Sequence, residues 1–310
     1  MSATCEALVI GFNRPRLLLG ALDNLRDLGV HRVFVGIDGP RAGRPDDAEA
    51  VQACRDVAQA ARSHGPIELL VQEENLGCRR GVATAISWFL EKVGEGAIIE
   101  DDVRVSPAFL AFAAEGLARY RDEPLVGMVS GYTPLSPVID PPRAHLTWYG
   151  GIWGWATWAE NWRAWPGPPA TTALFDTAPI PVASTLVRRR ITHGARLVEL
   201  GLDTWDYSWD TARVLNGWLC ATPSARLTTN VGFNTDATHT SRGGTPRAPI
   251  DLADAATRFE YRDLLRPQTD VDEAIVYALD RWYGAVARRI PRRLRWRLIE
   301  FAIRTRLLAS

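Results

Sequence analysis

The sequence lacks a hydrophobic run long enough to cross a membrane. Its two longest uncharged stretches, residues 124–139 and 144–159, are broken by Pro, Gly and polar residues. A membrane-spanning helix needs about 20 consecutive apolar residues. The apolar run at residues 7–12 is too short for the core of a signal peptide, and no Lys or Arg precedes it. We therefore expect a cytoplasmic protein.

Cysteine and lysine are scarce, and charge is unevenly distributed. The four cysteines lie far apart without a CxxC pair, which argues against a zinc finger and a disulfide scaffold: Cys5, Cys54, Cys78 and Cys220. Lys92 is the only lysine. The formal net charge is zero, but residues 281–310 hold nine Arg and one Glu, which gives this tail +8 and leaves −8 for residues 1–280. An acidic main part argues against a nucleic-acid-binding protein.

The first half of the chain alternates short β-rich runs with helical patterns, as expected of an α/β fold with a mostly parallel sheet flanked by helices. We predict strands at residues 7–11, 32–37, 67–72, 97–100 and 125–130. Helices are predicted to start near Pro15, Asp46 and Pro107. The second half is rich in Trp, with nine of the twelve between Trp148 and Trp218. There we expect a helix near 182–200, strands at 218–221 and 226–231, and helices at the C-terminus.

Polar residues follow each of the first four predicted strands, where ligands bind in parallel α/β sheets. They are Asn13 and Arg14, Asp38 and Gly39, residues 74–77, and the triplet Glu100, Asp101 and Asp102. The first of these sites reads GFNRPR instead of GxGxxG, and no GxxxxGK[ST] motif occurs. These absences argue against a dinucleotide-dependent dehydrogenase and a P-loop protein.

The acidic triplet is expected about 0.5 times by chance in a chain of this composition, so its position matters more than its presence. It ends the apolar strand predicted at 97–100, where carboxylates are able to chelate a hard divalent cation that also holds a diphosphate. The alternative interpretation is an exposed acidic turn before the helix that starts after Ser106.

An ordered set of segments resembles a known enzyme family. GFNRP, IDGP, ENLGCRRG, IIEDD, WGWATW, WDYSW and NVGF occur in this order within residues 4–240. Together they resemble a GT-A-fold glycosyltransferase with a Rossmann-like sheet, and especially bacterial relatives of the β-1,2-N-acetylglucosaminyltransferases of eukaryotic glycan synthesis. The resemblance implies a nucleotide-sugar donor, most often a UDP-sugar, and Mn²⁺ or Mg²⁺.

The resemblance also implies roles for individual residues. Asp102 matches the family's metal ligand, while Arg14 is expected to contact the nucleotide or its phosphate and Asp38 to accept a hydrogen bond from the base. The remaining predicted donor-site residues are Asn13, Glu100 and Asp101, with Arg79 and Arg80 as phosphate clamps. For the two arginines, a solvated helix start is the alternative.

A second acidic cluster is the candidate for the general base of an inverting transfer. Asp206 lies in WDYSW and aligns best with the catalytic Asp of the family, where the motif is the tighter WDDW. Because the spacing differs, Asp203 and Asp210 remain candidates, and a helix N-cap is the structural alternative for Asp206.

Further residues of the second half are candidates for ligand contacts. Trp153, Trp155 and Trp158 could stack on an acceptor sugar, although aromatic residues this dense usually form a core. His239 could complete the metal site or contact the diphosphate. The basic tail could bind an anionic membrane at the inner face of the plasma membrane or pack on the domain as a helix.

We predict a GT-A domain over residues 1–250, with a nucleotide-sugar half at 1–131 and an acceptor half at 132–250, followed by a helical segment at 251–310. The predicted function is metal-dependent, inverting transfer of a sugar, hexosyl or N-acetylhexosaminyl, to a hydroxyl of a glycan, a lipid-linked acceptor or a small molecule. A sugar nucleotidyltransferase and a non-catalytic sugar-binding protein are the alternatives.

Overall fold

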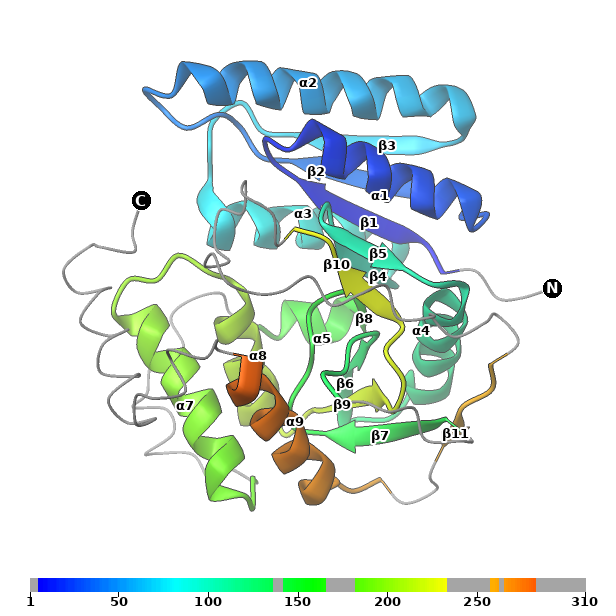
Figure 1. Cartoon of the computed structure of the whole chain (residues 1–310), viewed down its shortest axis with the longest axis vertical. Helices are drawn as coiled ribbons and strands as arrows, with labels where there is room; N and C mark the ends of the chain where they lie inside the picture. Colours follow the sequence, from blue (N-terminus) through cyan, green and yellow to red (C-terminus); the bar gives the residue numbers. More distant parts are fainter. Residues whose placement is uncertain (1–4, 136–141, 166–181, 233–256, 262–264, 283–310) are drawn as a thin grey trace.

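The computed structural model describes residues 5–135, 142–165, 182–232, 257–261 and 265–282 (Figure 1). In its first half the elements are β1 (Ala7–Gly11), α1 (Pro15–Asp27), β2 (Val33–Ile37), α2 (Pro45–Ala61), the 3₁₀ turn η1 (Arg62–His64), β3 (Ile67–Val71), α3 (Gly77–Val93), β4 (Glu95–Glu100), β5 (Val103–Val105), α4 (Pro107–Tyr120) and β6 (Val126–Ser130). The second half contains β7 (Arg143–Thr147), β8 (Trp155–Trp158), α5 (Ala159–Arg163), α7 (Thr185–Glu199), α8 (Asp206–Leu215), β9 (Leu219–Pro223), β10 (Thr228–Asn230), β11 (Glu260–Tyr261) and α9 (Thr269–Trp282).

One sheet of nine strands forms the centre of the described structure, in the order β11-β7-β9-β6-β8-β4-β1-β2-β3. The strands β3, β2, β1 and β4 are parallel neighbours, and β6 with β9 and β7 with β11 are further parallel pairs. Antiparallel pairing occurs where β8 lies between β4 and β6 and where β7 meets β9. The predicted α/β fold with a mostly parallel sheet is therefore confirmed.

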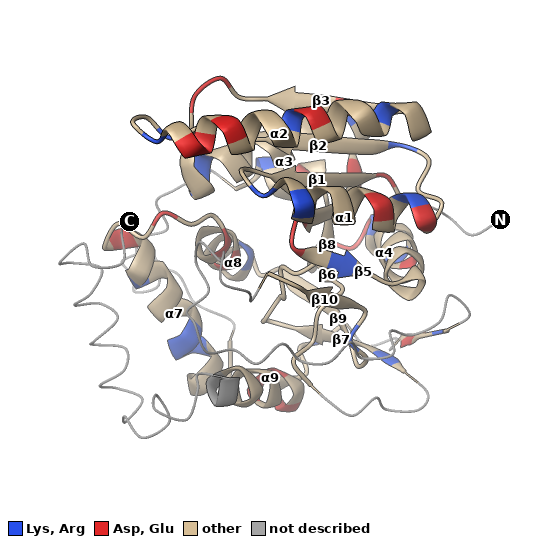
Figure 2. Cartoon of the chain, turned by 45° about the horizontal axis from the view of Figure 1, so that its top comes forward, with Lys and Arg blue, Asp and Glu red and all other residues tan. Residues whose placement is uncertain are grey.

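Helices cover both faces of this sheet, so its inner strands such as β1, β2 and β6 are buried on both sides, whereas the edge strand β3 is half-buried. Along β1, Ala7 and Val9 pack with residues of α1, α2 and α4, while Leu8 and Ile10 pack with residues of α3, α5 and α8. Alternate side chains of a strand point to opposite faces, which explains why β1 is apolar throughout. In Figure 2 the charged residues lie mainly on the helices and in the loops, and the sheet interior carries almost none.

Several helix ends follow from local sequence. Pro15, Pro45 and Pro107 each occupy the first turn of a helix, where proline's missing N–H costs nothing. Ser106 caps α4 by accepting a hydrogen bond from the backbone N–H of Phe109 at 3.1 Å. The N-cap of α4 is thus Ser106, so the acidic triplet does not cap this helix.

The second half contains strands that its sequence did not predict. β7 and β8 fall in the Trp- and Gly-rich region, and the three-residue β5 pairs with β10 outside the large sheet. The predicted helix at 182–200 and strands at 218–221 and 226–231 correspond to α7, β9 and β10. No helix in the described ranges is long and apolar enough to cross a membrane.

Candidate active site

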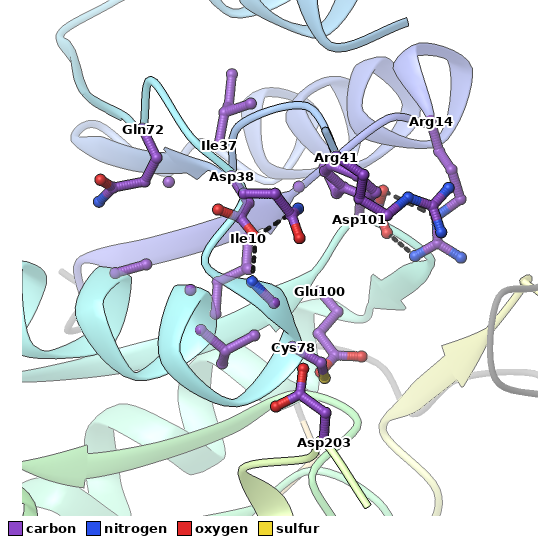
Figure 3. A pocket seen from close by; sticks show the side chains of 18 of the residues that line it. Ile10, Arg14, Ile37, Asp38, Arg41, Gln72, Cys78, Glu100, Asp101 and Asp203 are labelled. Atoms are coloured by element: carbon purple, nitrogen blue, oxygen red, sulfur yellow. Dashed lines mark hydrogen bonds and ion pairs between the residues drawn. The ribbon is translucent and has the colours of Figure 1, made fainter. Parts of the chain in front are cut away.

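A cavity of about 660 Å³, here called the strand-end pocket, opens at the carboxyl ends of β1, β2, β3 and β4 (Figure 3). The loops that follow these four strands supply its polar lining, and residues from α3 and the segment before α8 close it. The residues used below are Arg14, Asp38, Arg41, Gln72, Asn75, Cys78, Glu100, Asp101 and Asp203. The predicted position of a ligand site, beyond the ends of the parallel strands, thus coincides with a large cavity.

Arg14 joins the first and fourth of these strand ends. Its Nε donates to Asp101 Oδ2 at 3.1 Å, its Nη2 contacts Asp101 Oδ1, and its Nη1 donates to Asp102 Oδ2 at 3.0 Å. Burial raises the pKa of Asp101 to about 6, although Arg14 opposes this shift. Because Arg14 is bound to both carboxylates, it balances part of their charge and lies within reach of any anion that they attract through a cation.

Asp102 lies between Arg14 and the segment after β10. Its Oδ1 accepts a hydrogen bond from Asn230 Nδ2 at 3.2 Å, and its backbone carbonyl accepts one from the N–H of Val231 at 2.7 Å. A Cβ built at Gly232 would lie only 2.4 Å from Asp102 Oδ2. The glycine therefore leaves open the space beside this oxygen that any other residue would fill.

These groups fit a hard divalent cation, which prefers oxygen ligands. Asp102 Oδ2 lies beside the space left by Gly232 and accepts one hydrogen bond from Arg14, whereas Asp101 accepts hydrogen bonds from Arg14 on both of its oxygens. Among the described residues, no group of three or more His, Cys, Asp or Glu could hold a metal ion. The described residues alone thus offer a cation at Asp102 an incomplete set of ligands.

Glu100 lies deeper in the strand-end pocket, near Cys78 and Asp203 (Figure 3). Burial raises its pKa to about 8, and the negative charges of Asp102 and Asp101 add to the shift. Glu100 and Asp101 line the strand-end pocket, and Asp101 and Asp102 are only 2% and 8% exposed, so the triplet is not the exposed turn of the alternative interpretation.

Asp38 organises the loop between β3 and α3. Its Oδ1 accepts from the backbone N–H of Gly39 and of Leu76, both at 2.9 Å, and its Oδ2 accepts from Gly77 N–H at 3.1 Å and Asn75 Nδ2 at 3.0 Å. Four donors saturate this carboxylate. The side chains of Asn75, Gln72 and Arg41 share the pocket with it. Asn75 belongs to the predicted strand-end segment 74–77, whereas sequence reasoning did not single out Gln72 and Arg41.

Three of the predicted donor-site residues point elsewhere. Asn13 donates to Asp47 on α2 at 2.8 Å and does not line the strand-end pocket. Arg79 and Arg80 line a separate groove on the other side of α3, although Arg79 Nε lies 3.7 Å from Asp203 Oδ1. The helical phase of α3 separates these two arginines from Cys78, which faces the strand-end pocket.

The three candidate bases are divided between two cavities. Asp203 lines the strand-end pocket, whereas Asp206 and Asp210 line a cavity of about 280 Å³, here called the α8 pocket, together with Tyr132, Trp153 and Arg190. Asp206 is the first residue of α8, but it forms no N-cap, because the preceding Trp205 occupies that position. The segment at residues 203–206 therefore contributes Asp203 to one pocket and Asp206 to the other, so the two pockets are neighbours.

Asp206 and Asp210 differ in their partners. Asp210 Oδ1 accepts a hydrogen bond at 2.8 Å from Arg213, whose side chain is fully buried. Asp206 contacts the Thr204 hydroxyl and forms no ion pair among the described residues. Burial raises the pKa of both carboxyls, and the charge of Asp210 adds to the shift of Asp206. Asp206 is thus the carboxylate with fewer partners among the described residues.

A buried polar network that sequence reasoning missed fixes one wall of the α8 pocket. Asp272 of α9 accepts hydrogen bonds from the backbone N–H of Trp148 at 3.0 Å and of Tyr149 at 2.9 Å. Arg213 donates to the carbonyl of Trp148 at 2.8 Å while it holds Asp210. The Trp148 backbone is therefore held between α8 and α9, and its neighbours Tyr149 and Gly150 line the pocket.

The tryptophans mainly form a core. Trp155 is 1% exposed and stacks on Trp205 with ring centroids 5.4 Å apart, and Trp158 is 6% exposed. Trp153 is the one of the three predicted sugar-stacking residues that lines the α8 pocket, where its ring lies 4.4 Å from that of Tyr132. His239 and residues 283–310 of the basic tail lie outside the described residues.

No protein-family model matches the chain, and no curated protein matches it. Among solved structures, a mannosyltransferase from Pyrobaculum calidifontis, in complex with GDP-Man and Mn²⁺, is 18% identical, with a TM-score of 0.41 and coverage of 68% of this chain and 70% of that chain. HddC from Yersinia pseudotuberculosis is 9% identical, with a TM-score of 0.29 and coverage of 50% and 77%. These similarities are remote.

Proposed function

We propose that the protein is a metal-dependent glycosyltransferase that moves a sugar from a nucleoside diphosphate sugar, a UDP-sugar by the family resemblance, to a hydroxyl group of an acceptor, with inversion. One observation carries the proposal. A large pocket with an acidic strand end lies next to a smaller, partly aromatic pocket that contains Asp206, a carboxylate without an ion-pair partner in the described part of the chain.

The donor would occupy the strand-end pocket, with its diphosphate near Arg14 and the acidic triplet. Asp102 would hold the divalent cation, which would neutralise the negative charge that develops on the leaving diphosphate. Arg14 already contacts Asp101 and Asp102, so its guanidinium is positioned to donate to phosphate oxygens as well. Asp38 would act indirectly, by fixing the loop at residues 75–77 that closes the pocket.

The acceptor would enter the α8 pocket, with a sugar or other flat face against Trp153. Asp206 would take the proton from the acceptor hydroxyl as its oxygen attacks the anomeric carbon of the donor sugar. The bond from that carbon to the phosphate oxygen breaks, and its electron pair leaves with the nucleoside diphosphate. The raised pKa of Asp206 suits this role, because a general base works best when its pKa approaches the working pH.

The first test is a thermal-shift screen of nucleotide sugars on the full chain, with and without Mn²⁺. A ligand at 100 times its Kd stabilises a protein by about 2.7 kcal/mol, so a donor gives a clear signal. We expect the Mn²⁺-dependent part of this shift in the wild type and in Asp122→Ala, an exposed control, and its loss in Asp102→Ala. If no nucleotide sugar stabilises the wild type, the proposal is wrong.

Product analysis then separates the reaction classes. A glycosyltransferase releases a nucleoside diphosphate and lengthens the acceptor, whereas a nucleotidyltransferase releases pyrophosphate. Donor binding without any turnover, across a panel of hydroxyl acceptors, would favour the non-catalytic alternative.

A further inference from the structure

The helix α3 presents two chemically different faces. In an α-helix each residue turns by about 100°, so residues 78, 81, 82 and 85 share one face, and residues 80, 83, 87 and 90 share the opposite one. The first set lines the strand-end pocket, and the second lines a groove of about 350 Å³ between α3 and α5, here called the arginine groove. The groove is therefore a separate site on the far side of the helix.

The arginine groove carries an excess of positive charge. Arg79, Arg80 and Arg163 line it, and Glu91 is the one carboxylate among its lining residues. Neither Arg80 nor Arg163 has a hydrogen-bond or ion-pair partner among the described residues. Arg79 lies 3.7 Å from Asp203, and its buried Nε has no hydrogen-bond partner.

The floor of the groove is held in place by the packing of α5 on α3. Trp162 Nε1 donates to Ser87 Oγ at 2.9 Å, and Trp162 and Trp165 are 4% and 8% exposed. These tryptophans therefore form part of the floor of the groove. They expose too little surface for a ligand to stack on them. The two helices that carry Arg80 and Arg163 pack on each other, so both side chains line one groove, and neither has an ion-pair partner among the described residues.

Among the described lining residues, Arg80 and Arg163 have no ion-pair partner, whereas Arg79 is paired with Asp203 outside the groove and Glu91 is the one carboxylate. The remaining positive charge favours an anionic ligand. The planar fork of arginine suits phosphate oxygens, which accept paired hydrogen bonds. We propose that the arginine groove binds a phosphate or diphosphate group, independently of the strand-end pocket. That group belongs either to a soluble phosphorylated ligand or to a phosphate-bearing lipid.

The test uses sodium pyrophosphate as the probe, titrated calorimetrically into the full chain with EDTA present, so that binding through a divalent cation is excluded. The double variant Arg80→Gln/Arg163→Gln is compared with Arg44→Gln/Arg266→Gln, two exposed arginines outside the groove that give the same charge change. We expect affinity to fall about tenfold or more in the groove variant and to stay unchanged in the control. All four positions are exposed, so thermal unfolding should confirm that each variant is folded.

Cosedimentation with phosphatidylcholine vesicles, with and without a long-chain prenyl monophosphate, identifies the source of the phosphate. If the wild type binds the phosphate-bearing vesicles and the groove variant does not, the ligand is a lipid phosphate. If only pyrophosphate binding depends on the groove, the ligand is soluble. The inference is overturned if the wild type does not bind pyrophosphate, or if both double variants lose affinity equally. Neither outcome bears on donor binding, which the Mn²⁺-dependent screen measures separately.

Discussion

Asp272 offers a direct test of the network that holds the α8 pocket. Its side chain is fully buried and accepts two backbone hydrogen bonds, from Trp148 and Tyr149. Burial raises its pKa from 3.8 to about 6, against the effect of these two hydrogen bonds and of Arg213. The perturbation that we consider is Asp272→Asn, which keeps the shape of the side chain and removes its titration.

The magnitude follows from linkage between protonation and folding. A rise of roughly two pKa units corresponds to about 3 kcal/mol at 1.36 kcal/mol per unit. Because the folded-state pKa is the higher one, the folded protein binds more protons than the unfolded chain between pH 3.8 and about 6. The contribution of Asp272 to the free energy of unfolding therefore falls as pH rises through this window and is constant above it.

The assay is urea unfolding of the wild type and of Asp272→Asn at several pH values. Burial also raises the pKa of Asp101 to about 6 and that of Glu100 to about 8, so the wild-type curve alone combines several groups. The difference between the two proteins is therefore the informative quantity. The amide keeps one acceptor and turns its NH2 toward the other N–H group, which lowers the stability of the variant by an amount that does not depend on pH. We expect the variant to gain about 3 kcal/mol relative to the wild type between pH 4 and 7. A difference independent of pH would refute the reasoning.

Three further predictions concern the proposed active site. Asp102→Ala should remove the Mn²⁺ dependence of nucleotide-sugar binding without unfolding the protein; an unchanged dependence would assign the cation elsewhere. Asp206→Asn should slow transfer by about 10²- to 10⁴-fold with donor affinity unchanged, whereas Asp203→Asn should alter mainly donor affinity, because Asp203 lines the strand-end pocket. Steady-state kinetics with both substrates separates these effects, and normal turnover in Asp206→Asn would remove it as the base. Gly232→Ala should weaken Mn²⁺-dependent binding, because its Cβ would displace Asp102, while Gly65→Ala, which has open space around it, should not.

The first half of the fold is readable from sequence for a physical reason. Each of its strands is a short apolar run followed by polar residues, and prolines mark several helix starts, so local signals coincide with element ends. The predicted strand at 67–72 corresponds to β3 (Ile67–Val71), for example. In contrast, β8 is buried on both faces between β4 and β6, so it shows no alternation of polar and apolar residues. The tryptophans of β8 therefore indicated an aromatic cluster in the sequence and did not indicate a strand.

The sequence predicted where the site lies in the fold. It did not predict which of the candidate residues line the same cavity. The strand-end rule located Arg14, Glu100 and Asp101 in the lining of a large cavity, with Asp102 bound to Arg14. It did not show that α8 starts at Asp206 and so separates Asp203 from Asp206 and Asp210. Nor did it show the orientation of Arg79 and Arg80, which follows from the phase of α3 once its start is known.

The partnership of α9 with the α8 pocket depends on contacts that no local pattern reveals. Asp272 lies more than 120 residues after Trp148, yet it holds the backbone of that residue, and Ser184 before α7 donates to Glu273 of the same helix at 2.6 Å. Leu279 also lines the α8 pocket. Since Arg213 holds the other side of the Trp148 peptide, the wall forms only when α8, α9 and the segment after β7 are packed together. Helix α9 is therefore part of the structure that shapes this pocket, although composition alone groups it with the tail.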